Sequence, residues 1–341
     1  MAPVIGRGPF RHRALCLIAL AALVAVAALA GLAVGARAIP PAEIWRALTA
    51  FDPTNDAHII LRQLRVPRTV LGILAGAALG IAGAVMQAVT RNPLAEPGLL
   101  GINAGAAVAI LIGVTVFGLD GIEQYLWLGI LGAGLAGIAV FVLGRGHDAG
   151  VDPVRLVLAG AGLSVMLGAL AGILLINAPP EVHEAFRQWG AGSVAGRGGG
   201  VIPALGAALL AGAALASFIA PGLNALALGR EVGHALGARP LLTWSLACLC
   251  VMLLAGGATA AVGPIGFVGL VAPHLARLMA GADMRWILPF SAGIAALLLL
   301  LADILGRIVA SPAEVAAGII ATIIGGPFFI LGVRRFRMVR L

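Results

Sequence analysis

The chain contains 341 residues, of which 61% are hydrophobic and only 11% are charged, and its formal net charge is +8. A soluble domain carries about 25% charged residues, so this composition excludes an ordinary soluble protein and indicates an integral membrane protein. All 22 basic residues are arginine. They flank the apolar stretches, and we therefore interpret them as a signal of membrane topology rather than of nucleic-acid binding.

The first apolar stretch, residues 14–36, follows three arginines and ends near Ala36-Arg37-Ala38, a pattern that resembles a signal peptide with its cleavage site. The stretch is 23 residues long, whereas a typical signal core has about 7–15. We expect a retained first helix, with a cleaved signal peptide as the alternative.

The apolar runs and their interruptions predict an all-α membrane bundle of ten spans. These are placed at 14–35, 66–90, 97–115, 124–144, 153–176, 202–220, 240–261, 266–280, 286–307 and 314–333. The third and eighth spans are short and bordered by Gly and Pro. Short, interrupted spans at corresponding positions in the two halves of a transporter point to a binding or gating region. Within the second span, Gly72, Gly76 and Gly80 share one helix face and predict close packing against a neighbouring helix.

The arginines also predict an orientation. With residues 1–13 as a cytoplasmic N-terminal segment, 14 arginines fall inside and 8 outside, as the positive-inside rule requires. Both termini are then cytoplasmic, which fits an even number of spans.

Residues 91–105 interrupt the apolar pattern with two prolines and three glycines. Irregular backbone at membrane depth is tolerated only where protein or a water-filled cavity satisfies its polar groups, so this segment is our candidate for a substrate path. The polar Gln87, Asn92 and Asn103, with Met86 beside them, are candidate path residues. Hydrogen bonding between helices is the alternative role for these polar groups.

Three arginines, Arg62, Arg65 and Arg68, precede the second span on the predicted outer side. They form either a basic docking patch for an acidic soluble partner or a set of side chains that reach lipid headgroups. Arg307 at the outer end of the ninth span could join the patch, and Asp303 could instead simply pair with Arg307 at helical spacing.

The predicted inner loop 221–239 is long for a connection between spans. It reads as a short helix through Leu228, a break at Gly229 and an amphipathic turn from Arg230 to Leu236. The loop is either an interfacial helix on the lipid surface or a surface that receives force from a cytoplasmic motor subunit.

Several chemistries are absent from the sequence. It has no HExxH motif and no lysine, which excludes a P-loop ATPase within this chain, and its three cysteines lack metal-site spacing. No charge-paired acid lies in the middle of a span, which weakens the hypothesis of an ion-coupled carrier. We expect no catalytic residue, no metal and no cofactor in this chain.

These residues resemble the permeases of type II ABC importers, of the FecCD type, over about residues 60–335. The resemblance rests on Arg65-Val-Pro-Arg68, Gly83-Ala-Val-Met-Gln87, the whole segment 91–105, Leu226-Ala-Leu-Gly229, the segment Gly263 to Arg277, Leu301-Ala-Asp303 and Gly325-Gly-Pro-Phe-Phe-Ile330. It implies one transmembrane permease domain, 1–341, in the type II ten-helix bundle.

The resemblance also implies roles for individual residues. Arg65, Arg68 and Arg307 would meet acidic residues of a substrate-binding protein. The loop would be the coupling helices, seated on an ATPase through Leu228, Gly229, Arg230, Glu231, Ala235, Leu236 and Gly237. Other members often carry an acidic residue directly after the loop glycine, whereas Arg230 stands there in this chain.

The function implied is the permease of an ATP-driven importer in the bacterial inner membrane, which moves a ferric siderophore by alternating access. Cobalamin or haem is the alternative cargo, and a gradient-driven carrier or a membrane scaffold is the alternative class. The implied partners are two ATP-binding subunits that hold ATP and Mg, a periplasmic or lipid-anchored binding protein, and a second permease, either a copy or a paralogue. The surrounding bilayer completes the assembly, and no nucleic acid is expected.

Overall fold

The computed structural model describes residues 10–35, 37–119, 122–144 and 153–335. Over these residues all regular secondary structure is helical, which confirms the predicted fold class. The elements are α1 Phe10–Ala33, α2 Pro41–Thr49, α3 Asp56–Ile59, a π-helical turn Ile60–Arg65, α4 Val66–Thr90, a 3-10 turn Pro97–Leu100, α5 Ile102–Phe117, α6 Ile122–Gly144, α7 Pro153–Ile176, α8 Pro180–Gly190, α9 Val201–Ala227, α10 Arg230–Ala235, α11 Pro240–Val262, α12 Val268–Ala280, α13 Met284–Val309 and α14 Ala317–Arg335.

Each of the ten predicted spans coincides with one helix, but not all ten are full-length. Among the described residues, seven helical segments are long and apolar enough to cross a membrane, and three apolar helices, α5, α12 and α14, are shorter. The third and eighth spans are therefore short as predicted, and the tenth is short as well. The third begins at Ile102 rather than at 97, because residues 97–100 form a separate 3-10 turn.

Helix α4 lies at the centre of the bundle, in contact with α9, α11, α12 and α13. Its glycines explain the close packing. A Cβ atom on Gly76 would lie 2.6 Å from Ala296 Cα, and one on Gly80 would lie 2.2 Å from the Ser291 carbonyl oxygen. Only glycine lets the α4 and α13 backbones approach so closely, which confirms the packing role predicted for this ridge.

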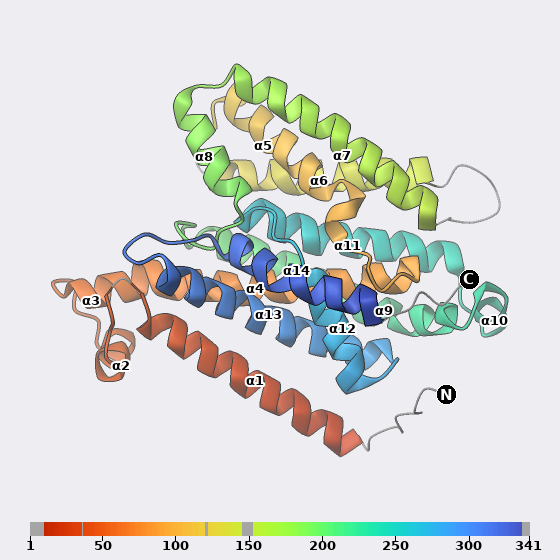
Figure 1. Cartoon of the computed structure of the whole chain (residues 1–341), viewed down its shortest axis with the longest axis horizontal. Coiled ribbons are helices and arrows are strands. Elements are labelled where there is room, and N and C mark those ends of the chain that lie inside the picture. Colours follow the sequence, from red (N-terminus) through yellow and green to blue (C-terminus); the bar gives the residue numbers. More distant parts are fainter. Residues whose placement is uncertain (1–9, 36, 120–121, 145–152, 336–341) are drawn as a thin grey trace.

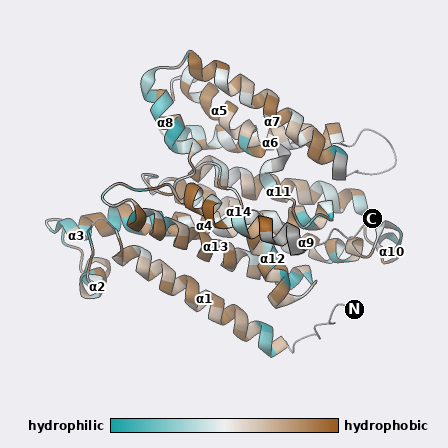
Figure 2. Cartoon of the chain, in the orientation of Figure 1, coloured by the Kyte–Doolittle hydropathy of each residue, from teal (hydrophilic) through white to brown (hydrophobic). Residues whose placement is uncertain are grey.

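The bundle has two distinct ends (Figure 1). Helices α2, α3 and α8 lie at one end, and α10 and the start of α1 lie at the other. We call these the α2 end and the α10 end. Hydrophilic residues gather towards the two ends and apolar residues cover the helices between them (Figure 2), as a membrane-spanning bundle requires.

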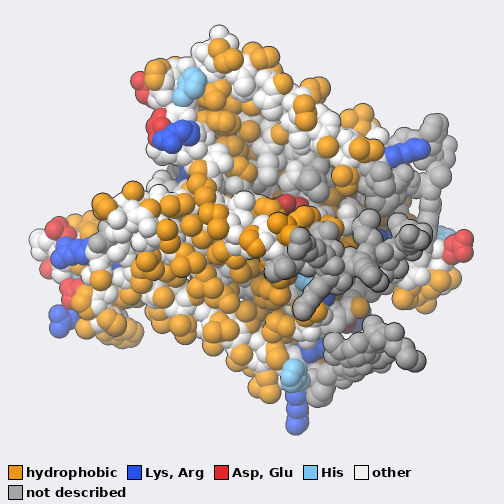
Figure 3. All heavy atoms as spheres, viewed as in Figure 1, with side chains coloured by type: hydrophobic (Ala, Val, Ile, Leu, Met, Phe, Trp, Pro, Cys, Tyr) orange, Lys and Arg blue, Asp and Glu red, His pale blue; other side chains and the backbone are white. Residues whose placement is uncertain are grey.

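The outer helices differ sharply from the central ones in burial. In the most apolar window of each helix, 78% of residues are buried in α4 and α11, whereas only 11% are buried in α7 and 22% in α1 and α9. On the described part of the face drawn in Figure 3, hydrophobic side chains accordingly predominate, and most charges lie near the margins, apart from an acidic side chain near the centre. These outer helices are available to lipid or to further subunits.

The predicted inner loop is shorter than expected. Residues 221–227 continue α9, with Pro221 inside the helix, because Leu223 is buried in the core and Leu226 is buried beside Gly233 of α10, and both hold this last stretch in place. The connection proper begins at Leu228. The second half of the prediction is confirmed, since Arg230–Ala235 forms the separate short helix α10.

Candidate functional site

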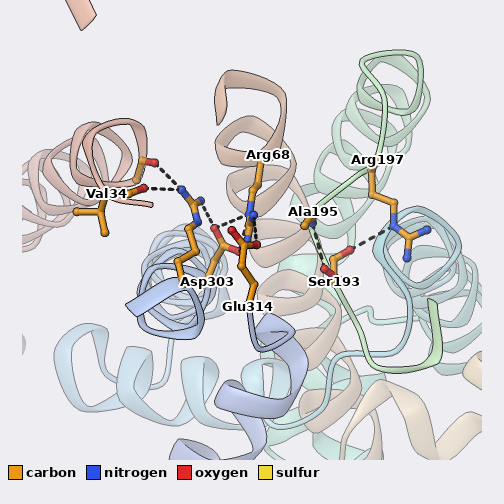
Figure 4. Close-up of polar contacts among 9 residues, drawn as sticks. Val34, Arg68, Ser193, Ala195, Arg197, Asp303 and Glu314 are labelled. Carbon is orange, nitrogen blue, oxygen red and sulfur yellow. Dashed lines mark hydrogen bonds and ion pairs between the residues drawn. The ribbon is translucent and has the colours of Figure 1, made fainter. Parts of the chain in front are cut away.

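A cluster of arginines and acids lies at the α2 end of the bundle (Figure 4). Arg68 at the start of α4 places Nη2 2.7 Å from Asp303 Oδ1 and Nη1 2.6 Å from Glu314 Oε2. Asp303 on α13 also pairs with Arg307, one helical turn further along. The pairing of Asp303 with Arg307, which the sequence left as an alternative, is therefore confirmed.

Arg65 and Arg307 both cap the C-terminal end of α1. Arg65 Nη1 donates to the carbonyl oxygens of Leu32 and Ala33 at 2.7 and 2.9 Å. Arg307 Nη1 donates to those of Gly31 and Val34 at 2.7 and 3.0 Å. The last carbonyls of a helix lack internal partners and carry partial negative charge, so two cations stabilise this end strongly.

The three arginines predicted to dock a partner are thus mostly enclosed. Arg65 is 6% exposed and Arg307 is 4% exposed, while the Arg68 side chain is 13% exposed. Arg62 lies on the exposed surface instead, with its guanidinium 4.8 Å from the Phe51 ring centre. The structure gives Arg65 and Arg307 a clear role in holding α1, and their role in docking stays a prediction.

A π-helical turn explains how one helix can present both Arg65 and Arg68 inward. At the end of this turn the Val66 N–H donates to the Leu61 carbonyl oxygen, five residues back. The extra residue in the π-helical turn rotates the side chains that precede α4 about the helix axis, relative to the side chains of α4 itself. Such turns are frequent at functional sites.

The loop between α8 and α9 closes the same end of the bundle. Ser193 N donates to the Val262 carbonyl oxygen at 2.8 Å, and Gly318 N donates to that of Gly192 at 2.8 Å, so the loop joins the ends of α11 and α14. Arg197 Nε donates back to the Ser193 carbonyl oxygen at 3.3 Å (Figure 4). Burial of the guanidinium lowers the pKa of Arg197.

At the α10 end, the coupling loop predicted from the sequence forms a projecting surface. Gly229 adopts φ 114° and ψ 155°, a backbone conformation that favours glycine. A second positive φ, 83°, occurs at Gly237. Gly233 lies against the Ala225 carbonyl oxygen, so α10 rests on the end of α9.

The outer face of α10 and its flanks is apolar with few charges. The exposed side chains from Leu228 to Leu236 are those of Leu228, Glu231, Val232, His234, Ala235 and Leu236. Arg230 begins α10, but its side chain lies outside the described part of the structure. Large apolar side chains gathered on a surface loop typically mark a protein contact.

Arg91 links the central helix α4 to the end of α9, just before this loop. The sequence did not indicate this contact. It ends α4 in the left-handed conformation, with φ 50°, and its guanidinium donates to the Leu226 carbonyl oxygen near the end of α9. A basic residue directly after an apolar span was the available signal, but it gives no information about a partner 135 residues away.

The predicted path residues form internal hydrogen bonds. Gln87 Nε2 donates to the Leu270 carbonyl oxygen at 3.2 Å, and Gln87 Oε1 accepts from Arg277. Asn103 Oδ1 accepts from Thr259 Oγ1 at 2.8 Å. Asn92 Oδ1 caps its own turn, and Met86 is buried. Gln87 and Asn103 therefore make the hydrogen bonds between helices that were the alternative role for these residues. A position in the substrate path stays a prediction for Gln87, Asn103, Asn92 and Met86.

Glu96 in the interrupted segment is a further candidate that the sequence did not single out. Its Oε1 accepts a hydrogen bond from the Phe267 backbone N–H at 2.8 Å. Phe267 has φ 65° and directly precedes α12, and its ring lies 6.3 Å from that of Phe329 on α14. Glu96 therefore links the interrupted segment to two short helices of the other half of the chain.

Helix α12 starts deep in the bundle rather than at its surface. A Cβ atom on Gly83, in the second half of α4, would lie 1.8 Å from the Gly269 carbonyl oxygen. The start of α12 thus lies beside the interior of α4. Over the described residues, no group of three or more His, Cys, Asp or Glu side chains could hold a metal ion.

Comparison with known proteins shows the family to which this chain belongs. A model of the FecCD transport family matches residues 22–335. The chain is 40% identical over 324 residues to the ferric enterobactin transport system permease protein FepD of Escherichia coli (strain K12), covering 95% of this chain and 96% of that protein. It is 38% identical over 292 residues to the hemin transport system permease protein HmuU of Yersinia pestis, covering 83% and 86%. Among solved structures, a metal-chelate type ABC transporter in an inward-facing conformation superposes with a TM-score of 0.81 at 26% identity, covering 94% of this chain and 99% of that one.

Proposed function

Since the chain belongs to the FecCD transport family and is an ABC-transporter permease of the membrane, we propose that it imports a ferric siderophore across the inner membrane, driven by ATP on separate subunits. The observation that carries the proposal is the 40% identity to a ferric enterobactin permease along 95% of this chain. Haem is the second candidate cargo, because a hemin permease is 38% identical. Cobalamin is a third.

We propose that the α10 end faces the cytoplasm, with both chain termini, and that an ATPase subunit docks there. The exposed apolar side chains of Leu228, Val232 and Leu236 support this, because they would be covered by such a partner. Movement of α10 would pass to α9 directly and to α4 through Arg91 and Leu226. Catalysis of ATP hydrolysis, with its Mg, belongs to the partner.

We propose that a periplasmic or lipid-anchored binding protein docks at the α2 end. The partly exposed Arg68 would meet its acidic residues, and the enclosed Arg65 and Arg307 would hold the end of α1 beneath the contact. A second permease, a copy or a paralogue, would complete the path beside this chain. Cargo would then cross by alternating access at the shared interface.

The test is uptake in cells that lack this permease and are then complemented with it. Labelled ferric enterobactin, haem and cobalamin are supplied side by side, and each assay is repeated with ATP depleted while the ion gradient is maintained. We expect complementation for the siderophore only, and its loss without ATP. Uptake that survives ATP depletion would instead indicate a gradient-driven carrier, and rescue of haem or cobalamin uptake would replace the proposed cargo.

A further inference from the structure

We propose that a cavity near the α10 end binds an anionic phospholipid with a hydroxyl-bearing headgroup. The cavity has a volume of about 370 Å³ and lies between α4, α9 and α13. Its lining residues are Ile81, Ala213, Ala216, Ser217, Ala220, Arg285, Leu288 and Pro289. Its size falls within the usual range of ligand sites.

The polar end of the cavity carries the positive charge of Arg285, which pairs with no acidic side chain among the described residues. Arg285 is exposed, and its side chain makes no hydrogen bond or ion pair with any described residue. The nearest acid in sequence, Asp283, is already engaged, since its Oδ1 accepts from Asn224 Nδ2 at 2.7 Å and from the Arg285 backbone N–H at 3.0 Å. An arginine at the end of a membrane bundle with no partner of its own fits a phosphodiester anion.

The remaining wall of the cavity is apolar. Ile81, Ala216 and Leu288 contribute only hydrocarbon. The hydroxyl of Ser217 donates to the Ala213 carbonyl oxygen at 2.8 Å, so no free donor remains on this wall. A hydrocarbon surface directly beside an isolated guanidinium matches an acyl chain attached to a phosphate, and does not match a wholly polar ligand.

Two prolines remove helical donors beside the same cavity. Pro221 and Pro289 each lie inside a helix, four residues after the lining residues Ser217 and Arg285 respectively. Proline has no N–H, so the carbonyl oxygens of Ser217 and Arg285 do not receive the usual helical hydrogen bond from the residue four positions later. A ligand hydroxyl is a donor that such carbonyl oxygens can accept. A glycerol headgroup supplies such hydroxyls, and a choline headgroup does not.

The test is native mass spectrometry of the purified full chain with lipids of identical acyl chains. Phosphatidylglycerol is compared with phosphatidylcholine, and glycerol phosphate serves as the free-anion probe. Arg285→Gln removes the charge and Ser217→Phe fills the apolar part. Their matched controls are Arg11→Gln, an exposed arginine at the same end, and Ala214→Phe, an exposed α9 residue outside the cavity.

We expect both cavity variants to retain at least fivefold less phosphatidylglycerol than the wild-type chain, and both controls to stay within twofold of it. Phosphatidylcholine and glycerol phosphate should be retained far less. Equal retention by Arg285→Gln and Arg11→Gln would overturn the proposal in favour of general surface attraction. Retention unchanged by Ser217→Phe would overturn it as well, because the cavity would then be empty or covered by another subunit. Equal binding of glycerol phosphate would replace the lipid with a free anion.

Discussion

At the scale of single residues, Asp303 is the one carboxylate that both Arg68 and Arg307 share inside the α2 end. We predict that Asp303→Asn destabilises the protein by about 3–5 kcal/mol, because removing one partner of a buried ion pair leaves uncompensated buried charge. The side chains of Asp303 and Arg307 are each only 2% exposed, so water cannot replace the lost carboxylate charge next to Arg307. Thermal unfolding of the purified protein measures the effect.

Glu314→Gln is the matched control for this prediction. Glu314 also pairs with Arg68, but its side chain is 38% exposed, so its loss should cost about 0–1 kcal/mol. Equal destabilisation by the two variants would show that Asp303 has no special place in the cluster.

Glu96 also joins distant segments, in this case through a hydrogen bond from the Phe267 backbone N–H. We predict that Glu96→Ala destabilises the loop before α12 by about 1–3 kcal/mol, since the Phe267 N–H then loses its acceptor in a part-buried site. Glu96→Gln keeps an acceptor oxygen and should cost less. Hydrogen exchange of the Phe267 amide reports the difference directly, and identical protection in both variants would contradict the link between the two segments.

At the scale of elements, Gly229 sets the angle between α9 and α10. We predict that Gly229→Ala costs about 1–3 kcal/mol locally, because φ 114° is a conformation that other residues avoid. The strain would displace α10 from α9 and reduce the stimulation of the partner ATPase by cargo, while the bundle itself stays folded. ATPase activity of the assembled transporter, with and without loaded binding protein, measures this coupling.

Gly196→Ala provides the control for that experiment. Gly196 also has a positive φ, 68°, and open space where a Cβ would lie, but it is at the opposite end of the chain fold, in the loop after α8. Loss of coupling in both variants would indicate general damage rather than a role of α10.

The elements show which parts of the structure the sequence could predict. Long apolar runs predicted α4 and α11 closely, because a span needs little more than length and hydropathy. The sixth span was predicted to end at 220, with a separate short helix through Leu228, whereas both parts form one helix, α9, which runs to Ala227 with Leu223 and Leu226 buried. Local rules yield to tertiary packing at such positions.

The candidate site was harder to predict, because its contacts join distant segments. The position of Arg65 beside a span was readable, but its partners are carbonyl groups at the end of α1, 32 and 33 residues earlier. The acceptor role of Glu96 depends on Phe267, which is 171 residues away. Residue types and spacing indicate which groups need partners, and only the assembled fold shows which partners they have.

At the scale of the whole molecule, the outer helices α7 and α9 differ in their exposed glycines. Both expose large apolar side chains, such as Val165 and Ile176 on α7 and Leu210 and Phe218 on α9. On α7, however, Gly162, Gly168 and Gly172 have nothing within 4 Å of the position of a Cβ, whereas on α9 this holds for Gly206 alone. Because membrane helices associate through small residues that allow close approach, α7 is suited to pack against another protein helix.

We therefore predict that α7 faces the second permease and α9 faces lipid. With the three cysteines Cys16, Cys248 and Cys250 replaced by serine, Val165→Cys on α7 should form an oxidative crosslink to the adjoining permease in native membranes. Phe218→Cys on α9 is the control, since Phe218 is 73% exposed and Val165 is 75% exposed. A crosslinked species of twice the chain mass identifies a second copy, and a different added mass identifies a paralogue carrying its own cysteine. If Phe218→Cys crosslinks as readily as Val165→Cys in transport-competent membranes, α7 has no privileged place at the interface, and the substrate path must be sought along another face of the bundle.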